Sequence, residues 1–135
     1  MNGYLLDTDW VIDLLNNQAP AVQALPTLTA AGVAISLITY GETFEGAYYA
    51  RNQSAALVAL QRFLAGVQLL PLSPPIVEQF GILRGALPRN HRQQVGDLDL
   101  LIAATAITHN LTLVTRNVRD FRLIPGVYLY ENATR

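Results

Sequence analysis

The sequence contains no cysteine and no lysine, and it has few charged residues of any kind. Of its 135 residues, 14% are charged and 51% are hydrophobic, with a formal net charge of -1. The absence of cysteine excludes a disulfide scaffold, a thiolate zinc site and a cysteine nucleophile. The absence of lysine excludes Walker-type phosphate loops and protein kinases. So little charge to cover a surface indicates that part of it lies in an interface with a partner.

Long hydrophobic runs and a basic N-terminal leader are also missing. The longest apolar stretch, around residues 100–107, is far shorter than a membrane-spanning helix requires. The opening MNGYLLDTDW has no basic residue ahead of an apolar segment, unlike a secretory signal. We therefore expect a cytoplasmic protein without membrane association, in which residues 1–135 form a single domain.

Short apolar runs alternate with stretches of helical periodicity along the chain. The expected strands are Tyr4–Leu6, Val33–Ser36, Gln68–Leu70, 111–115 and 127–130. Helices are expected after Asp7, between Pro20 and Pro26, from Thr39, from Asn52 to Leu64, from Ser73 to Leu87 and from Asp97 to His109, with a polar loop at 88–96. This alternation is typical of a parallel sheet with helices on both faces. The sequence thus predicts a three-layer α/β/α fold with a central, mainly parallel sheet.

Four of the carboxylates stand at the openings of three expected helices. Asp7 follows the first strand, Glu42 lies just after the second, and Asp97 and Asp99 open the late apolar helix. If these strands are neighbours, the four acids meet beyond the carboxyl ends of the sheet. Two carboxylates about 4 Å apart repel by roughly 4 kcal/mol at an effective dielectric of 20. Such a cluster needs a cation, and oxygen ligands favour magnesium or manganese.

Each of these acids also has a purely structural interpretation. Asp7 or Thr8 could cap the first helix, and Thr39 with Glu42 fits the capping-box pattern. Asp97 could be an N-cap. Asp99 would then lie in the first turn of the helix, where the helix dipole favours an acid. The two interpretations stay open for each residue taken singly. Their shared placement, in a chain with so few charges, favours a common site.

Three further features bear on binding. The basic residues are all arginine, and Arg116, after a strand end, could hold a phosphate or pair with a nearby acid. Asp13 is expected at a solvent-exposed helix position. An aromatic stripe is expected to pack in the core, with a homodimer seam or a partner-helix groove as the alternative. Its members are Tyr40, Phe44 and Tyr48, with Tyr49 beside them.

Three blocks of the sequence resemble the PIN-domain ribonucleases, in particular the VapC-type toxins of toxin–antitoxin pairs. The blocks are YLLDTDWVIDLL, SLITYGETFEG and VGDLDLLIAATAITHNLTLVTRNVRDFRLIPGV, in the family's order and spacing. The resemblance implies a PIN-like fold with catalytic, metal-binding acids at Asp7, Glu42 and Asp99. Asp97 resembles an additional acid found in many members.

The resemblance also marks two departures from the family pattern. Asn117 stands where the family often has an aspartate, and Asp120 is a candidate to compensate for it. Asp9 stands where many relatives carry asparagine. These departures concern a second metal position, and the first metal position is unaffected.

The chemistry that the resemblance implies is metal-dependent hydrolysis of RNA. Mg²⁺, or Mn²⁺, held by Asp7 and Asp99 would activate a water that Glu42 orients for attack on a phosphodiester bond. Residues expected to support these acids or to contact phosphate are Thr8, Thr115, Arg116 and Asn117. The implied partners are single-stranded or structured RNA, a small cognate antitoxin and a second copy in a homodimer.

Two other functions compete with this interpretation. The run Asp7-Thr8-Asp9-Trp10-Val11 matches the opening motif of haloacid-dehalogenase-like phosphatases, although that family usually supplies a lysine that this chain lacks. The other alternative is a noncatalytic PIN-like binding module. The complete set of acids argues against it, because a binding module gains nothing from their mutual repulsion.

Overall fold

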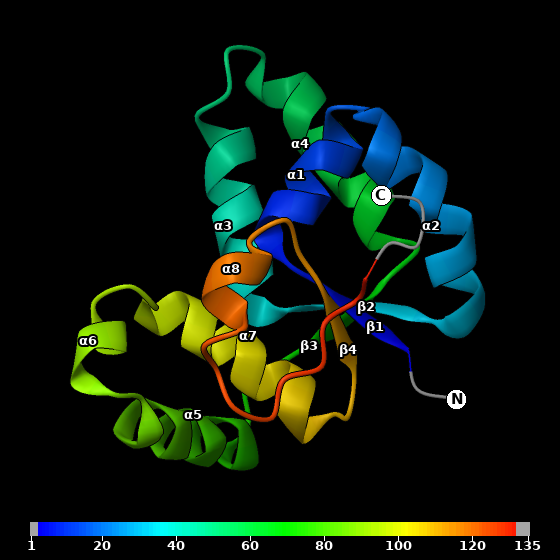
Figure 1. Ribbon diagram of the computed structural model, residues 1–135. Helices are drawn as coiled ribbons and strands as arrows, with labels where there is room; N and C mark the ends of the chain where they lie inside the picture. Colours follow the sequence, from blue (N-terminus) through cyan, green and yellow to red (C-terminus); the bar gives the residue numbers. More distant parts are fainter. Residues whose placement is uncertain (1–2, 132–135) are drawn as a thin grey trace.

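A four-stranded parallel sheet forms the centre of the computed structural model, which describes residues 3–131 (Figure 1). The strands are β1 (Tyr4–Leu6), β2 (Val33–Ser36), β3 (Gln68–Leu70) and β4 (Thr112–Val114). Their order is β3-β2-β1-β4, and all three neighbouring pairs are parallel. The carboxyl ends of β1, β2 and β4 therefore lie side by side, as the predicted site requires.

The strands are buried on both faces, which explains their continuous apolar runs. Leu5 packs into the core on one face of the sheet and Leu6 into the core on the other. Leu113 and Val114, their register partners on β4, divide in the same way. Because side chains alternate along a strand, each strand needs a helical layer on both sides.

One face of the sheet is covered by α1 (Thr8–Leu15), α2 (Ala19–Ala31) and the end of α4 (Gln53–Leu64). The opposite face is covered by α5 (Pro74–Ala86), α7 (Asp97–Thr108) and α8 (Val118–Phe121). The remaining helices are α3 (Leu37–Tyr48), which contacts α4 and α7 at the margin of the sheet, and the short α6 (Arg89–Arg92). The predicted three-layer α/β/α fold is confirmed.

A close approach of two glycines fixes the entry into the central strands. The N–H of Tyr4 donates to Gly32 O at 2.9 Å, and a Cβ on Gly3 would lie 2.6 Å from that same oxygen. Gly32 itself has a φ of +103°, a conformation that side chains other than glycine rarely adopt. The two strands that carry the site are thus joined tightly at their amino ends.

Several predicted boundaries are wrong. Pro26 lies inside α2 and does not end it, because Ala21 and Leu28 pack on the same core across the proline. The loop at 88–96 contains α6, and α8 was not predicted. Residues 127–130 make only an isolated bridge, Leu113 to Leu129, instead of a full strand.

The aromatic stripe packs in the core only at Tyr40, which lies against the cluster of Leu6, Trp10 and Val11. Phe44 is 40% exposed and Tyr48 is 46% exposed, and their rings stack on each other at 5.9 Å. The buried stripe of α3 is the neighbouring one, Thr39, Thr43 and Ala47. Because α3 stands at the margin of the sheet, only one narrow side of it faces the interior, and the alternative of an exposed binding face stays a prediction.

Within residues 3–131, no helix has both the length and the apolar character that crossing a membrane requires.

Candidate functional site

Asp7 is the central carboxylate of the site and one of the few buried polar side chains. It follows β1 directly, forms the N-cap of α1 and is 5% exposed. The N–H of Thr8 donates to Asp7 Oδ1 at 2.8 Å, and the hydroxyl of Thr115 donates to Asp7 Oδ2 at 2.7 Å. Two fixed donors therefore hold the carboxylate at the carboxyl end of the central strand.

Burial raises the pKa of Asp7 from 3.8 to about 7, and the nearby charge of Asp9 adds to the rise. The hydrogen bonds from Thr115 and Thr8 oppose it, and the charge of Asp99 contributes a smaller increase. A carboxylate that retains its proton close to neutral pH lacks a compensating positive charge. A bound cation would supply that charge.

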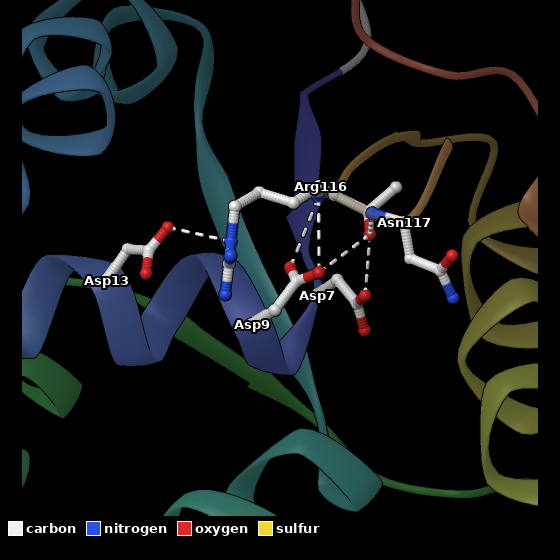
Figure 2. Close-up of polar contacts among 6 residues, drawn as sticks. Asp7, Asp9, Asp13, Arg116 and Asn117 are labelled. Carbon is white, nitrogen blue, oxygen red and sulfur yellow. Dashed lines mark hydrogen bonds and ion pairs between the residues drawn. The ribbon is translucent and has the colours of Figure 1, made fainter. Parts of the chain in front are cut away.

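Asp9 links the start of α1 to the segment that follows β4 (Figure 2). The backbone N–H of Arg116 lies 3.2 and 3.3 Å from the two Asp9 oxygens, and Thr115 Oγ1 lies 3.3 Å from Asp9 Oδ2. Burial raises the pKa of Asp9, while the contacts with Arg116 lower it. Asp9 therefore holds the loop that presents Thr115 to Asp7.

Glu42 is held by a chain of hydroxyl groups. Thr8 Oγ1 lies 2.6 Å from Glu42 Oε1 and 3.1 Å from Thr39 Oγ1, which in turn contacts Ser36 Oγ. A carboxylate oxygen accepts, so the single hydroxyl proton of Thr8 points to Glu42. The capping-box prediction for Thr39 and Glu42 is wrong, because Ser36 caps α3 by accepting from the N–H of Thr39 at 3.1 Å.

Asp99 lies among the other acids from the first turn of α7. Burial raises its pKa, followed by the charges of Glu42, Asp120 and Asp9. Three of the four acids predicted to converge, Asp7, Glu42 and Asp99, therefore interact at this edge. Asp9, which was only an uncertain candidate, lies with them in place of Asp97. Asp120, from α8, lies within range of Asp99 as well.

Asp120 accepts two hydrogen bonds from side chains. Gln94 Nε2 donates to one of its oxygens at 2.7 Å and Asn117 Nδ2 donates to the other at 3.1 Å. These hydrogen bonds lower the pKa of Asp120. Asn117 therefore serves the site by orienting a fifth acid, Asp120.

Asp97 does not join the acids with which it was predicted. It is exposed and forms an ion pair with Arg84 of α5, and the N-cap of α7 is Gly96. The role of Asp97 in catalysis stays a prediction without a contact to support it. The different placement follows from helix geometry, since positions two apart on a helix point in different directions.

The prediction that Asp13 is a solvent-exposed position is wrong. Its side chain is 19% exposed and forms an ion pair with the guanidinium of Arg116, Nε to Oδ2 2.9 Å. The pairing of Arg116 with a nearby acid, one of its two predicted roles, is therefore present. Figure 2 shows the Arg116 side chain extending away from Asp7 and Asn117 toward Asp13.

The donor chemistry of the site fits a hard divalent cation. All side chains that meet there offer oxygen, and their mutual repulsion and burial favour added positive charge. Between residues 3 and 131, no three acidic or histidine side chains already enclose a position for an ion. Mg²⁺ does not need such a cage, because it retains several waters and binds proteins through one or two carboxylates.

Sequence reasoning missed several residues that position the acids, namely Ser36, Thr39 as a hydroxyl partner, Gln94 and Asp13. Ser36 was detectable, because a serine at the end of a buried strand lies at the edge where sites form. Gln94 was not, because its contact depends on how the segment after α6 folds back onto α8.

Comparisons with known proteins extend over almost the whole chain. The sequence pattern of the PIN domain matches residues 4–127. "Ribonuclease VapC1" of Haemophilus influenzae (strain R2866) is 30% identical over 126 residues, which cover 90% of this chain and 91% of that protein. "tRNA(fMet)-specific endonuclease VapC" of Salmonella typhimurium (strain LT2) is 28% identical over 97% of this chain and 98% of its own length.

Solved structures give the same result. VapBC2 from Rickettsia felis, bound to a DNA fragment from its promoter, contains a chain with a TM-score of 0.84 and 30% identity, covering 94% of this chain and 96% of that one. DNA-bound VapBC from Salmonella typhimurium contains a chain with a TM-score of 0.87 and 28% identity, covering 96% and 98%. Sequence and fold therefore point to the same relatives.

Proposed function

The chain belongs to the PIN-domain family, and from this premise we propose that it is a metal-dependent endoribonuclease, the toxin of a type II toxin–antitoxin pair. The observation that carries the proposal is the gathering of Asp7, Glu42 and Asp99 at one edge of the sheet, around a buried carboxylate with a pKa of about 7. The names of the similar proteins, ribonuclease and tRNA-specific endonuclease, support RNA as the substrate.

The residues have distinct tasks in this mechanism. Asp7 and Asp99 would hold Mg²⁺, or Mn²⁺, which when bound neutralises a phosphate oxygen and lowers the pKa of a coordinated water. Thr115 keeps Asp7 in place, and Thr8 directs its proton to Glu42 so that the free lone pairs of this carboxylate can orient the attacking water. Attack in line with the departing oxygen would leave a 5′-phosphate on one product.

The proposed partners are an antitoxin, a second copy of this chain and RNA. The similar solved structures are complexes of toxin and antitoxin, which supports a small cognate antitoxin for this chain as well. A homodimer is consistent with the exposed aromatic face of α3 and with the low share of charged residues. Single-stranded RNA, or accessible loops of structured RNA, fits an open acidic edge, and we expect the protein to act in the cytoplasm.

The test is cleavage of a mixed RNA pool by the purified protein. Cleavage should require Mg²⁺, stop with EDTA and be lost in Asp7→Asn, while Glu78→Gln, which removes an exposed acid on α5, should behave like the unchanged protein. Activity that survives Asp7→Asn would reveal a contaminating nuclease and would leave the proposal without support.

The two alternatives are not favoured. A haloacid-dehalogenase-like phosphatase would use Asp9 as an acid–base group beside Asp7, yet here Asp9 is turned to the backbone N–H of Arg116. A phosphorylated Asp7 after incubation with a phosphate ester would support that function. A noncatalytic module would bind RNA equally well with Asp7→Asn and would cleave none.

A further inference from the structure

Arg116 carries a positive charge beside the acidic site, where it helps to lower the pKa of Asp9, but its guanidinium is paired with Asp13. Its backbone N–H already binds the carboxylate of Asp9, and its side chain passes over α1 to Asp13, one helical turn further (Figure 2). Asp9 and Asp13 are four residues apart and so lie on the same side of α1. The guanidinium is thus held next to the site and outside it.

The guanidinium is also available for binding. The side chain of Arg116 is 59% exposed, and its contact with Asp13 is an ion pair at 2.9 Å without a directed hydrogen bond. Among residues 3–131, its ion-pair partner is Asp13, which it reaches through Nε. The Arg116 end of this ion pair lies in solvent, which screens the attraction and limits its contribution to stability. A planar group with unused N–H donors matches the oxygens of a phosphate.

We propose that Arg116 binds a phosphate of the RNA next to the scissile one, and that Asp13 is the residue that positions it. This inference rests on the proposed ribonuclease function, which places the scissile phosphate at Asp7 and Asp99. The side chain of Arg116 points away from Asp7, so it meets a neighbouring phosphate of the same strand. Asp13 keeps the guanidinium from turning back onto the acids, where it would occupy the place of the cation.

Binding of RNA tests the first half of the proposal. The probe is a fluorescein-labelled single-stranded RNA of random sequence, kept intact by EDTA, with affinity measured by anisotropy at several salt concentrations. Arg116→Gln should weaken binding roughly tenfold and reduce the slope of log affinity against log salt by about 0.7, the value for one phosphate contact on a single strand. Arg116→Lys should retain the slope, since it keeps the charge.

The matched control is Arg122→Gln. Arg122 is an arginine of similar exposure, 61% for its side chain, and it is paired with Glu131 at 3.2 Å. This variant removes the same charge from the chain and should leave affinity within about twofold and the slope unchanged. If Arg116→Gln and Arg122→Gln behave alike, Arg116 contacts no phosphate and the proposal fails.

A double-mutant cycle tests the role of Asp13. Asp13→Asn should weaken RNA binding several-fold when Arg116 is present, because the guanidinium is no longer held in place. In the Arg116→Gln background the same change should leave binding equal or slightly tighter, because only a charge that repels phosphate is lost. If Asp13→Asn tightens binding equally in both backgrounds, Asp13 is merely a repelling charge and its positioning role is overturned.

Two further readouts separate this inference from the proposed function. With Mg²⁺, Arg116→Gln should raise the RNA concentration that gives half-maximal cleavage, whereas Arg122→Gln should leave cleavage unchanged. Melting temperatures should show that all variants are folded. A protein that cleaves RNA in an Asp7-dependent way but binds it equally well with Arg116→Gln would overturn this inference alone. A protein without Asp7-dependent cleavage would overturn the function on which it rests.

Discussion

Two helices of this protein open with the same pattern, an aspartate, one other residue and a second aspartate, and they use it in opposite ways. At α1 the first acid, Asp7, is buried and lies at the centre of the site, while the second, Asp9, holds the loop after β4. At α7 the first acid, Asp97, is exposed and paired with Arg84, while the second, Asp99, faces the site.

The difference comes from where each helix begins. The first acid of α1 is its N-cap, directly after a central strand, so the sheet edge receives that residue. In α7 the cap is Gly96, which follows the buried Val95, so Asp97 is the first helical residue and Asp99 lies two positions further along the helix. Because both pairs of aspartates are two residues apart, this spacing alone does not show which acid of a pair lies in the site. The position of the helix cap decides it.

The largest expected effect distinguishes the two site acids, Asp7 and Asp99, from the outer acid, Asp97. Asp7→Asn and Asp99→Asn should each lower RNA cleavage by at least about a thousandfold, the loss of several kcal/mol of charge stabilisation in the transition state. Asp97→Asn should stay within about threefold. The measurement is initial cleavage rate with Mg²⁺ for variants with unchanged circular dichroism. A strong loss in Asp97→Asn would mean that the pairing with Arg84 gives way to a role in the site.

The second prediction concerns stability and pH. The unfolded chain loses the Asp7 proton near pH 3.8, whereas the folded protein loses it only near 7. Between these values the unfolded state binds fewer protons, so the free energy of unfolding falls as pH rises. The accumulated loss is up to about 4 kcal/mol, at about 1.4 kcal/mol per pH unit.

Asp7→Asn should therefore stabilise the metal-free protein at pH 8 by an amount of that order, and hardly at all at pH 4. The amide can replace both hydrogen bonds, because the hydroxyl of Thr115 can turn to Asp9. Urea unfolding in EDTA across this pH range measures the difference, with Asp97→Asn as the control that should show none. If the two variants have the same pH dependence, burial of Asp7 is not costly.

The sequence predicted much of this site for clear physical reasons. The strands Tyr4–Leu6, Val33–Ser36 and Gln68–Leu70 are short apolar runs buried on both faces, which leave a strong signal. Asp7 and Glu42 follow two of these strands closely, and parallel topology brings such positions together.

What the sequence could not settle depends on the orientation of single helices. On α3 an aromatic stripe and a stripe of Thr39, Thr43 and Ala47 run one residue apart, and hydrophobicity alone favours burying the aromatic one. The other stripe is buried, because Thr39 joins the hydroxyl chain that holds Glu42. Contacts from Gln94 and Asp13 depend on loops and long side chains, for which spacing gives no signal.

A third prediction tests that hydroxyl chain. Thr8→Val removes the donor to Glu42 Oε1 while keeping the shape of the side chain, so Glu42 loses its fixed orientation. The maximal cleavage rate should fall roughly tenfold with little change in RNA affinity, the size of a charge-assisted hydrogen bond. Thr8→Ser should restore most of the rate. If Thr8→Ser is as slow as Thr8→Val, packing of the methyl group is responsible and the hydroxyl is not.

The smallest expected effect concerns the ion pair of the outer acid. Arg84 and Asp97 join α5 to α7 at the surface, where solvent screens their attraction and two flexible side chains must be ordered. A double-mutant cycle of Arg84→Gln and Asp97→Asn, measured by urea unfolding at low salt, should give a coupling below about 1 kcal/mol. The coupling should shrink further in high salt, since exposed charges are screened over about 3 Å at 1 M. A coupling that is large and insensitive to salt would mean that Asp97 is held as firmly as Asp9. The two helix openings would then differ only in which of their two acids lies nearer the sheet.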